Sequence, residues 1–423
     1  MRALLKKIQA YVARVPVLAW LLGFLVASVL ERLVGDVLAS VLGLPMVPPL
    51  LGVDVIFRAP LLIPSTIVYL LVAYILPAYV VARLTTPLVS KLLDLLPSWL
   101  FMLLHLILLY AVLHMWGGFD DYRLLVLRYI GIAIILTVSL NLVNGYMGEF
   151  SVAHGGFMAV GAYVSSIFTV WAFVRDDVFG PPALPPALGP FMFPLALILG
   201  GIAASIAALL VAIPSFRTRG DYLGVISLAL TYIVKSSIEN QEWIGGPRGF
   251  MNQPKWATLP WTFFGTLLCL VVIYNFIYST RGKGVMAIRD DEIAAELMTV
   301  DTRRTKVAAF LLSAFWAGIA GGLFAHILGY INPGTFGIMK STECLAMVYL
   351  GGLASISGSI VGAVLYTLLI EALRPLGIVK WMVIPTLVIL VIFLRREGIL
   401  GFRELSLGFL RPRKEVEHAP ASD

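Results

Sequence analysis

Ionisable side chains, the ones that do most protein chemistry, are few in this chain and scattered among apolar residues. Those near apolar stretches form no HExxH motif, no acid pair one helical turn apart and no Cys–His cluster, the spacings that hold a metal or activate a nucleophile. We therefore predict that the chain is not an enzyme and has no metal site. The six ionisable residues near apolar stretches are His105, His114, Lys235, His326, Glu343 and Glu371.

A nucleotide site is also missing from the sequence. It contains no GxxxxGK[ST] motif, the loop whose glycines and lysine hold nucleotide phosphates. We therefore predict no cofactor bound by this chain. If its activity is driven by ATP, the ATPase is another polypeptide.

The most charged interruption of the apolar sequence is 281–306, which holds six Lys or Arg and a cluster of acids. Asp290 or Asp291 is placed to cap a short helix, on which Ile293 and Leu297 share one face. The two apolar residues would form a small ridge surrounded by charged residues, which suits docking into a partner's groove. The alternative is a solvated helix that lies on the lipid headgroups. The predicted docking segment is Arg289, Asp290, Asp291, Glu292, Ile293, Ala294, Ala295, Glu296 and Leu297, with its ridge at Ile293, Ala294, Ala295 and Leu297.

A second polar stretch, 141–157, contains glycines that weaken a continuous helix. Broken helices at membrane depth occur where they line a cavity or are buried in protein. The stretch therefore predicts either part of a polar translocation path or a cytoplasmic turn with one interior histidine. The candidate path residues are Asn141, Asn144, Gly145, Gly148, Glu149, Ser151 and His154.

The elements that must position these stretches are membrane helices. The chain is 60% hydrophobic and only 13% charged, whereas soluble proteins have about 25% charged residues. Stretches of about 18 apolar residues, enough to cross a bilayer, recur along it. We predict an all-α polytopic membrane protein with about 12 crossings (range 10–12) and broken or re-entrant segments in its core. The predicted crossings are centred on 17–35, 60–82, 99–116, 124–143, 151–174, 190–214, 220–238, 259–279, 307–329, 340–354, 358–374 and 378–394.

The distribution of positive charge predicts the orientation. With both termini on the cytoplasmic side, 20 of the 31 Lys and Arg residues fall in cytoplasmic segments, as the positive-inside rule requires. The segment 281–306 then faces the cytoplasm. The net charge of +7 is explained by the same rule, so we predict lipid and protein partners and no nucleic acid.

Composition divides the chain into three predicted regions. Residues 1–123 are rich in Leu, Val and Pro, and we interpret them as accessory transmembrane helices. Small residues recur at helical spacing through 124–396, which is typical of closely packed membrane helices. Residues 397–423 are predicted to form a cytoplasmic tail.

Several runs within 124–396 resemble a known family, the LivM-type permease subunits of ABC importers for branched-chain amino acids. The runs occur in the order and at spacings like those of that family. They are SLNLVNGYMGEFSVAHGGFMAVGAY (139–163), RGDYLGVISLALTYIV (219–234), GGPRGF (245–250), the segment 282–326, and MVYLGGLASISGSIVGA (347–363).

The resemblance implies a permease of the bacterial inner membrane that works with four kinds of partner. These are a LivH-like second permease, two LivG/LivF-like cytoplasmic ATPases that bind ATP and Mg²⁺, a substrate-binding protein, and membrane lipid. The segment 289–297 would then be the helix that couples the permease to an ATPase. Two alternatives remain: the same type of permease carrying urea, amides or another small organic solute, and an ion-coupled secondary transporter. The latter should place membrane-embedded charges at repeat-related positions, and no such pair is apparent.

Overall fold

The computed structural model describes residues 15–52, 55, 59–216, 222–395, 397–401 and 404. The basic N-terminal segment and most of the predicted tail lie outside these residues. The described chain forms two compact units. The first holds the described residues up to Leu124 together with Glu371–Gly377, and the second holds Leu125–Ile370 and Ile378–Glu404.

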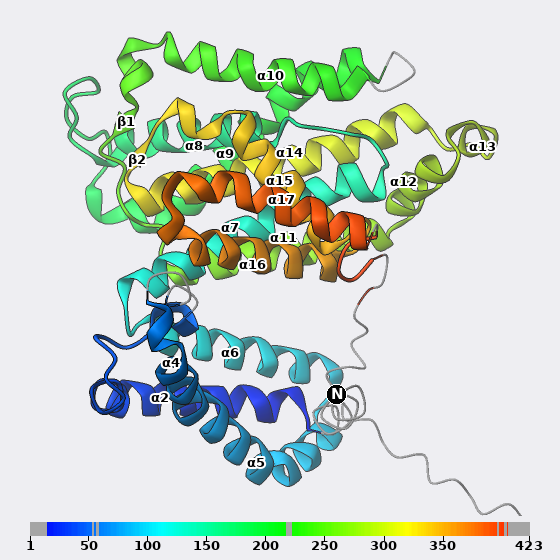
Figure 1. Cartoon of the computed structure of the whole chain (residues 1–423). Helices are drawn as coiled ribbons and strands as arrows, with labels where there is room; N and C mark the ends of the chain where they lie inside the picture. Colours follow the sequence, from blue (N-terminus) through cyan, green and yellow to red (C-terminus); the bar gives the residue numbers. More distant parts are fainter. Residues whose placement is uncertain are drawn as a thin grey trace, which may run out of the picture. The chain divides into compact units, whose positions relative to one another are not determined.

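The first unit is built from long apolar helices (Figure 1). A π-helical turn, η3, joins α4 and α5 into one continuous apolar stretch, and α2 packs against both α5 and α6. The elements are α2 (Val17–Val41), η1 (Pro49–Gly52), η2 (Pro60–Leu62), α4 (Ile63–Leu70), η3 (Leu71–Ile75), α5 (Leu76–Leu95) and α6 (Ser98–Gly117).

The second unit is a larger helical bundle, which begins within α7 and has two very short strands. Its elements are α7 (Asp121–Asn141), η4 (Leu142–Tyr146), α8 (His154–Phe173), η5 (Pro186–Leu188), α9 (Gly189–Ser215), α10 (Tyr222–Glu239), η6 (Glu242–Ile244), η7 (Gly246–Arg248), β1 (Phe250–Met251), α11 (Leu259–Tyr278), α12 (Thr280–Asp290), α13 (Glu292–Leu297), α14 (Thr302–Leu328), β2 (Tyr330–Ile331), η8 (Pro333–Phe336), α15 (Ile338–Gly351), α16 (Ile356–Ala372) and α17 (Lys380–Leu394). The last two residues of α16 and most of η9 (Arg374–Val379) belong to the first unit. The strands pair antiparallel, with Phe250 opposite Ile331.

The described residues contain ten helices long and apolar enough to cross a membrane. This confirms the predicted polytopic helical class and lies at the lower end of the predicted range. The two remaining predicted crossings, 340–354 and 358–374, are α15 with 14 residues and α16 with 17. At a rise of 1.5 Å per residue, α15 is about 21 Å long, shorter than a hydrocarbon core of about 30 Å.

These two short helices form a close antiparallel pair. A Cβ built on Gly351 would overlap the carbonyl oxygen of Gly358, and one on Gly362 would overlap that of Met347. Between the helices, Gly352 has φ +129°, a conformation that favours glycine. The two helices are therefore a tight pair joined by a glycine turn.

The centre of the second unit is a set of three helices, α8, α9 and α14, which run side by side (Figure 1). Their backbones approach closely through glycine. A Cβ on Gly161 of α8 would overlap the backbone oxygen of Gly318 on α14, and one on Gly200 of α9 would lie 2.7 Å from the oxygen of Gly161. Because there is no hydrophobic force between helices in lipid, the van der Waals packing that such close contact allows is one of the interactions that hold them together.

Candidate functional site

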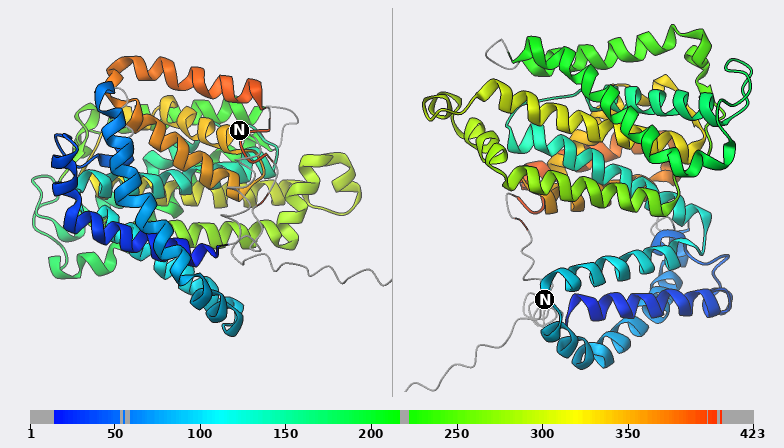
Figure 2. Two further views of the ribbon diagram at one scale, coloured as in Figure 1. Left: turned by 60° about the horizontal axis from the view of Figure 1, so that its bottom comes forward. Right: turned by 180° about the vertical axis from the view of Figure 1, so that it is seen from behind.

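The α12–α13 segment projects from one end of the second unit (Figures 1 and 2). Asp291 begins α13 as its N-cap, and its carboxylate accepts hydrogen bonds from the backbone N–H groups of Ile293 at 2.9 Å and Ala294 at 3.0 Å. Of the two predicted caps, Asp291 is thus the one used. Asp290 belongs to the end of α12 and pairs with Arg289 at 2.9 Å.

An exposed apolar ridge runs along α13. Ile293 is 65% exposed and Leu297 80%, and Met298, which directly follows the helix, is 77% exposed. Ala295 was predicted to belong to this ridge, and that part of the prediction is wrong, because its side chain is only 4% exposed. Two residues on a helix turn by about 200°, so Ala295 faces away from Ile293 and packs against the chain.

The acids of α13 make contacts back to α14. The Thr302 hydroxyl donates to the Glu296 carboxylate at 3.0 Å. Glu292 pairs with the Lys306 ammonium at 2.8 Å, while its own side chain remains 45% exposed. These contacts hold the short helix against the start of α14 with its ridge free.

Lys306 also joins the two predicted sites. Its Nζ lies 2.7 Å from Glu149 Oε1, and its side chain is 9% exposed. Glu149 comes from the candidate translocation path and Glu292 from the docking segment, so one ammonium links stretches far apart in the sequence. Gly148, at φ +76°, lies against the end of α12, where an added Cβ would be 2.7 Å from Arg289 Cγ.

The other polar residues of 141–157 face the interior of the unit. Asn141 is 1% exposed; its Nδ2 donates to Ser359 Oγ at 2.7 Å and to the Ser355 carbonyl oxygen at 3.0 Å, and its Oδ1 accepts from Ala354 N–H at 3.0 Å. A Cβ on Gly145 would overlap the same turn at Ala354. Asn141 and Gly145 therefore pack against the turn between α15 and α16, and the hydrogen bonds of Asn141 fix that turn in place.

His154 begins α8 and is 1% exposed. Its Nε2 lies 3.3 Å from the hydroxyls of Ser139 on α7 and Ser313 on α14, so the ring joins three helices. Ser151 is fully buried, and its N–H donates to Asn144 Oδ1 at 3.3 Å. The predicted interruption is present as the π-helical turn η4 and the non-helical residues before α8. A role for these residues in lining a path stays a prediction.

Comparison with known families decides the class of protein. Residues 122–394 match the family described as the permease component of branched-chain amino acid transport systems. The chain belongs to this family. The match begins at residue 122, so α2 to α6 precede it.

Curated relatives of this permease carry corresponding names. The LivM permease protein of the high-affinity branched-chain amino acid transport system is 31% identical in Salmonella typhimurium and 29% in Escherichia coli K12, over 64% of this chain and 68% of each relative. The LivH permease protein of Salmonella typhimurium is 26% identical over 64% of this chain and 92% of its own length. No solved structure matches.

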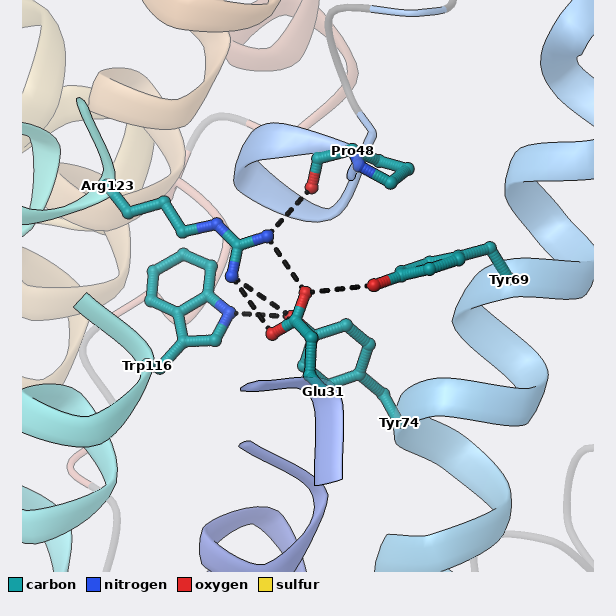
Figure 3. A network of polar contacts seen from close by, with 6 residues as sticks. All are labelled: Glu31, Pro48, Tyr69, Tyr74, Trp116 and Arg123. Atoms are coloured by element: carbon teal, nitrogen blue, oxygen red, sulfur yellow. Dashed lines mark hydrogen bonds and ion pairs between the residues drawn. The ribbon is translucent and has the colours of Figure 1, made fainter. Parts of the chain in front are cut away.

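The sequence analysis missed a charged cluster in the first unit of the permease, drawn in Figure 3. The Arg123 guanidinium binds the Glu31 carboxylate through two hydrogen bonds of 2.9 Å, and each side chain is 1% exposed. The two residues are 92 positions apart. A glutamate inside the apolar stretch 17–41 was the available signal, because a membrane-embedded charge needs a partner.

Aromatic residues complete this Glu31–Arg123 cluster. The hydroxyls of Tyr69 and Tyr74 both donate to Glu31, and Trp116 Nε1 donates to the Tyr74 oxygen at 2.9 Å. Arg123 also donates to the Pro48 carbonyl oxygen at 3.0 Å.

Proposed function

We propose that this permease is the membrane subunit of an ATP-driven importer for branched-chain amino acids and that α13 docks onto an ATPase subunit. The observation that carries the proposal is the exposed apolar ridge of α13, displayed within a charged rim at the end of a projecting segment. A helix with such an apolar face suits docking into a hydrophobic groove of a partner. Family membership supplies the solute class.

The partners follow from the family and from the sequence. The chain is similar both to LivM and to LivH proteins, which favours a translocation path formed with a second, LivH-like permease. Because the sequence has no P-loop motif, ATP and Mg²⁺ would bind to two LivG/LivF-like subunits. A substrate-binding protein would deliver the solute from the opposite side.

The orientation is part of the proposal. Both termini and the α12–α13 segment lie in the cytoplasm, and the protein resides in the bacterial inner membrane. The support is the excess of Lys and Arg in the segments assigned to that side. A cytoplasmic α13 is the geometry that a soluble ATPase requires.

The test replaces the ridge with acids, as Ile293→Asp with Leu297→Asp, in the importer reconstituted with its ATPases and binding protein. Both side chains are exposed, so we expect normal insertion, loss of ATPase co-purification and at least tenfold slower ATP-dependent leucine uptake. Val178→Asp is the matched control, an exposed apolar residue in the turn after α8, and should keep the ATPases bound.

Unchanged uptake by the double variant would overturn the docking role of α13. Urea or amide uptake without leucine uptake would overturn the solute class. Uptake driven by a proton gradient in vesicles that lack the ATPases would replace the whole proposal with a secondary transporter.

A further inference from the structure

Lys306 occupies an unusual position near the start of α14. Its side chain is almost fully covered, and its ammonium is within 2.8 Å of two carboxylates from different segments. It also lies 6.0 Å above the ring of Phe216, which follows α9. An ammonium has three donors in a tetrahedral arrangement, so it serves two acceptors at once.

The first carboxylate, Glu149, belongs to residues 147–153, the non-helical linker between η4 and α8. This linker is bound to further helices. The Val152 N–H donates to Ser227 Oγ on α10 at 2.9 Å, and the Gly155 N–H at the start of α8 donates to Ser341 Oγ on α15 at 2.9 Å. A pull on Glu149 therefore reaches the first turn of α8 and its neighbours.

The second carboxylate, Glu292, is the first residue of α13. It is 45% exposed, so water solvates it when it leaves Lys306. Glu149 is only 20% exposed, and Lys306 is less exposed still. Lys306, Glu149 and Glu292 are called the Lys306 cluster below. Its two ion pairs differ: the Glu149–Lys306 pair is largely buried, whereas Glu292 is exposed enough to leave Lys306 and bind again.

A second contact joins the same segments. Gly148 lies against Arg289 at the end of α12, one residue from Glu149, and its positive φ together with the short Cβ distance leaves no room for a side chain. The linker therefore contacts α12 directly through Gly148 and is joined to α13 through Lys306.

We propose that Lys306 is the positioning residue that converts displacement of α13 into movement of the linker and the start of α8. The inference rests on the proposed docking of α13 and adds the route by which an ATPase acts on the permease core. Lys306 touches no solute in this scheme. In this scheme the Glu292–Lys306 ion pair breaks and forms again, and the Glu149–Lys306 ion pair persists.

The experiment compares uptake per ATP hydrolysed in proteoliposomes that contain the complete importer. Glu292→Gln neutralises the exposed carboxylate, and we expect leucine uptake per ATP hydrolysed to fall at least fivefold in the complexes that retain their ATPases. Lys306→Gln should lower that ratio at least tenfold. Lys306→Arg, which keeps the charge and both acceptors, should recover most of it.

Arg304→Gln is the matched control. Arg304 lies two residues before Lys306 and pairs with Asp301 at 3.1 Å, but both side chains are exposed and this ion pair does not involve the linker. Its coupling ratio should equal that of the wild type. If Lys306→Gln fails to insert into the membrane, Glu292→Gln alone tests the inference. This variant should insert, because Glu292 is exposed to solvent and Lys306 retains its ion pair with Glu149.

Two results would overturn the inference. Normal uptake per ATP in Glu292→Gln would show that the Lys306 cluster transmits nothing, and loss of the ATPases from Lys306→Gln would show a role in docking instead. A wild-type importer that neither binds ATPases nor responds to ATP would refute the proposed function itself, so the two failures are distinguishable.

Discussion

Two charged clusters, one in each unit, use similar groups in opposite ways. In the first unit, Glu31 and Arg123 are each 1% exposed and form two hydrogen bonds within a shell of tyrosine and tryptophan (Figure 3). In the second unit, Lys306 is covered but one of its two carboxylates is 45% exposed. The buried Glu31–Arg123 pair resists separation, because neither group is accessible to water. In the Lys306 cluster, Glu292 can separate because water can solvate its carboxylate.

The role of an ion pair depends on how deeply its two groups are buried. A buried charge that loses its partner keeps its full desolvation penalty, so a closed pair holds its helices in one arrangement. A half-exposed carboxylate loses far less when its partner leaves, because solvent replaces the contact. We therefore expect the Glu31–Arg123 cluster to act on stability and the Lys306 cluster to act on movement.

The largest expected effect is on the closed pair. Arg123→Met leaves Glu31 buried without its cation, which should destabilise the first unit by about 3–5 kcal/mol. Thermal unfolding of the purified permease in detergent measures the loss. The double variant Glu31→Met with Arg123→Met should be more stable than Arg123→Met alone, since it leaves no unpaired charge; a double variant that is less stable would contradict the burial argument.

A smaller effect is expected where the second unit depends on close packing. Gly161→Val places methyl groups against the Gly318 backbone of α14, and overpacking of this kind is destabilising by about 1–3 kcal/mol. The same thermal measurement applies. Gly265→Ala on α11 is the control, because its Cβ would meet only Leu323 Cδ1 at an ordinary 3.4 Å; equal losses in both variants would refute the packing account.

The smallest stability effect is expected at the Lys306 cluster. Glu292→Gln should lower stability by about 1 kcal/mol or less, since Glu292 is 45% exposed and Lys306 keeps Glu149. Its leucine uptake per ATP should nevertheless fall several-fold in proteoliposomes. A stability loss as large as that of Arg123→Met would erase the contrast between the two clusters.

Local patterns in the sequence predicted much of the fold. Apolar stretches of about 20 residues predicted ten helices that the structure contains. A short-range rule on acids before a helix predicted a cap at Asp290 or Asp291, and the structure uses Asp291. The prediction exceeded the structure at 340–354 because hydropathy measures apolar content and α15 is apolar but only 14 residues long. Ala295 was misplaced because membership of a segment does not specify the face of a helix.

Contacts between distant residues were beyond sequence reasoning. Glu149 and Lys306 are 157 positions apart and Asn141 and Ser359 are 218 apart, and no local period relates such pairs. The candidate residues of 141–157 were chosen for polarity, yet only the fold separates those that hold helices together, such as His154, from Glu149, which reaches the docking segment.

Apolar length and composition decide whether a chain resides in a bilayer, so they were enough to predict the class of this protein, and its motif runs were enough to predict the family. Which charges meet became visible only in the folded chain. Pairing depends on how helices pack, and packing is set by three-dimensional contacts such as those of Gly161 with α9 and α14. Burial then decides whether an ion pair persists, as we expect for Glu31–Arg123, or can separate, as we expect for Glu292–Lys306.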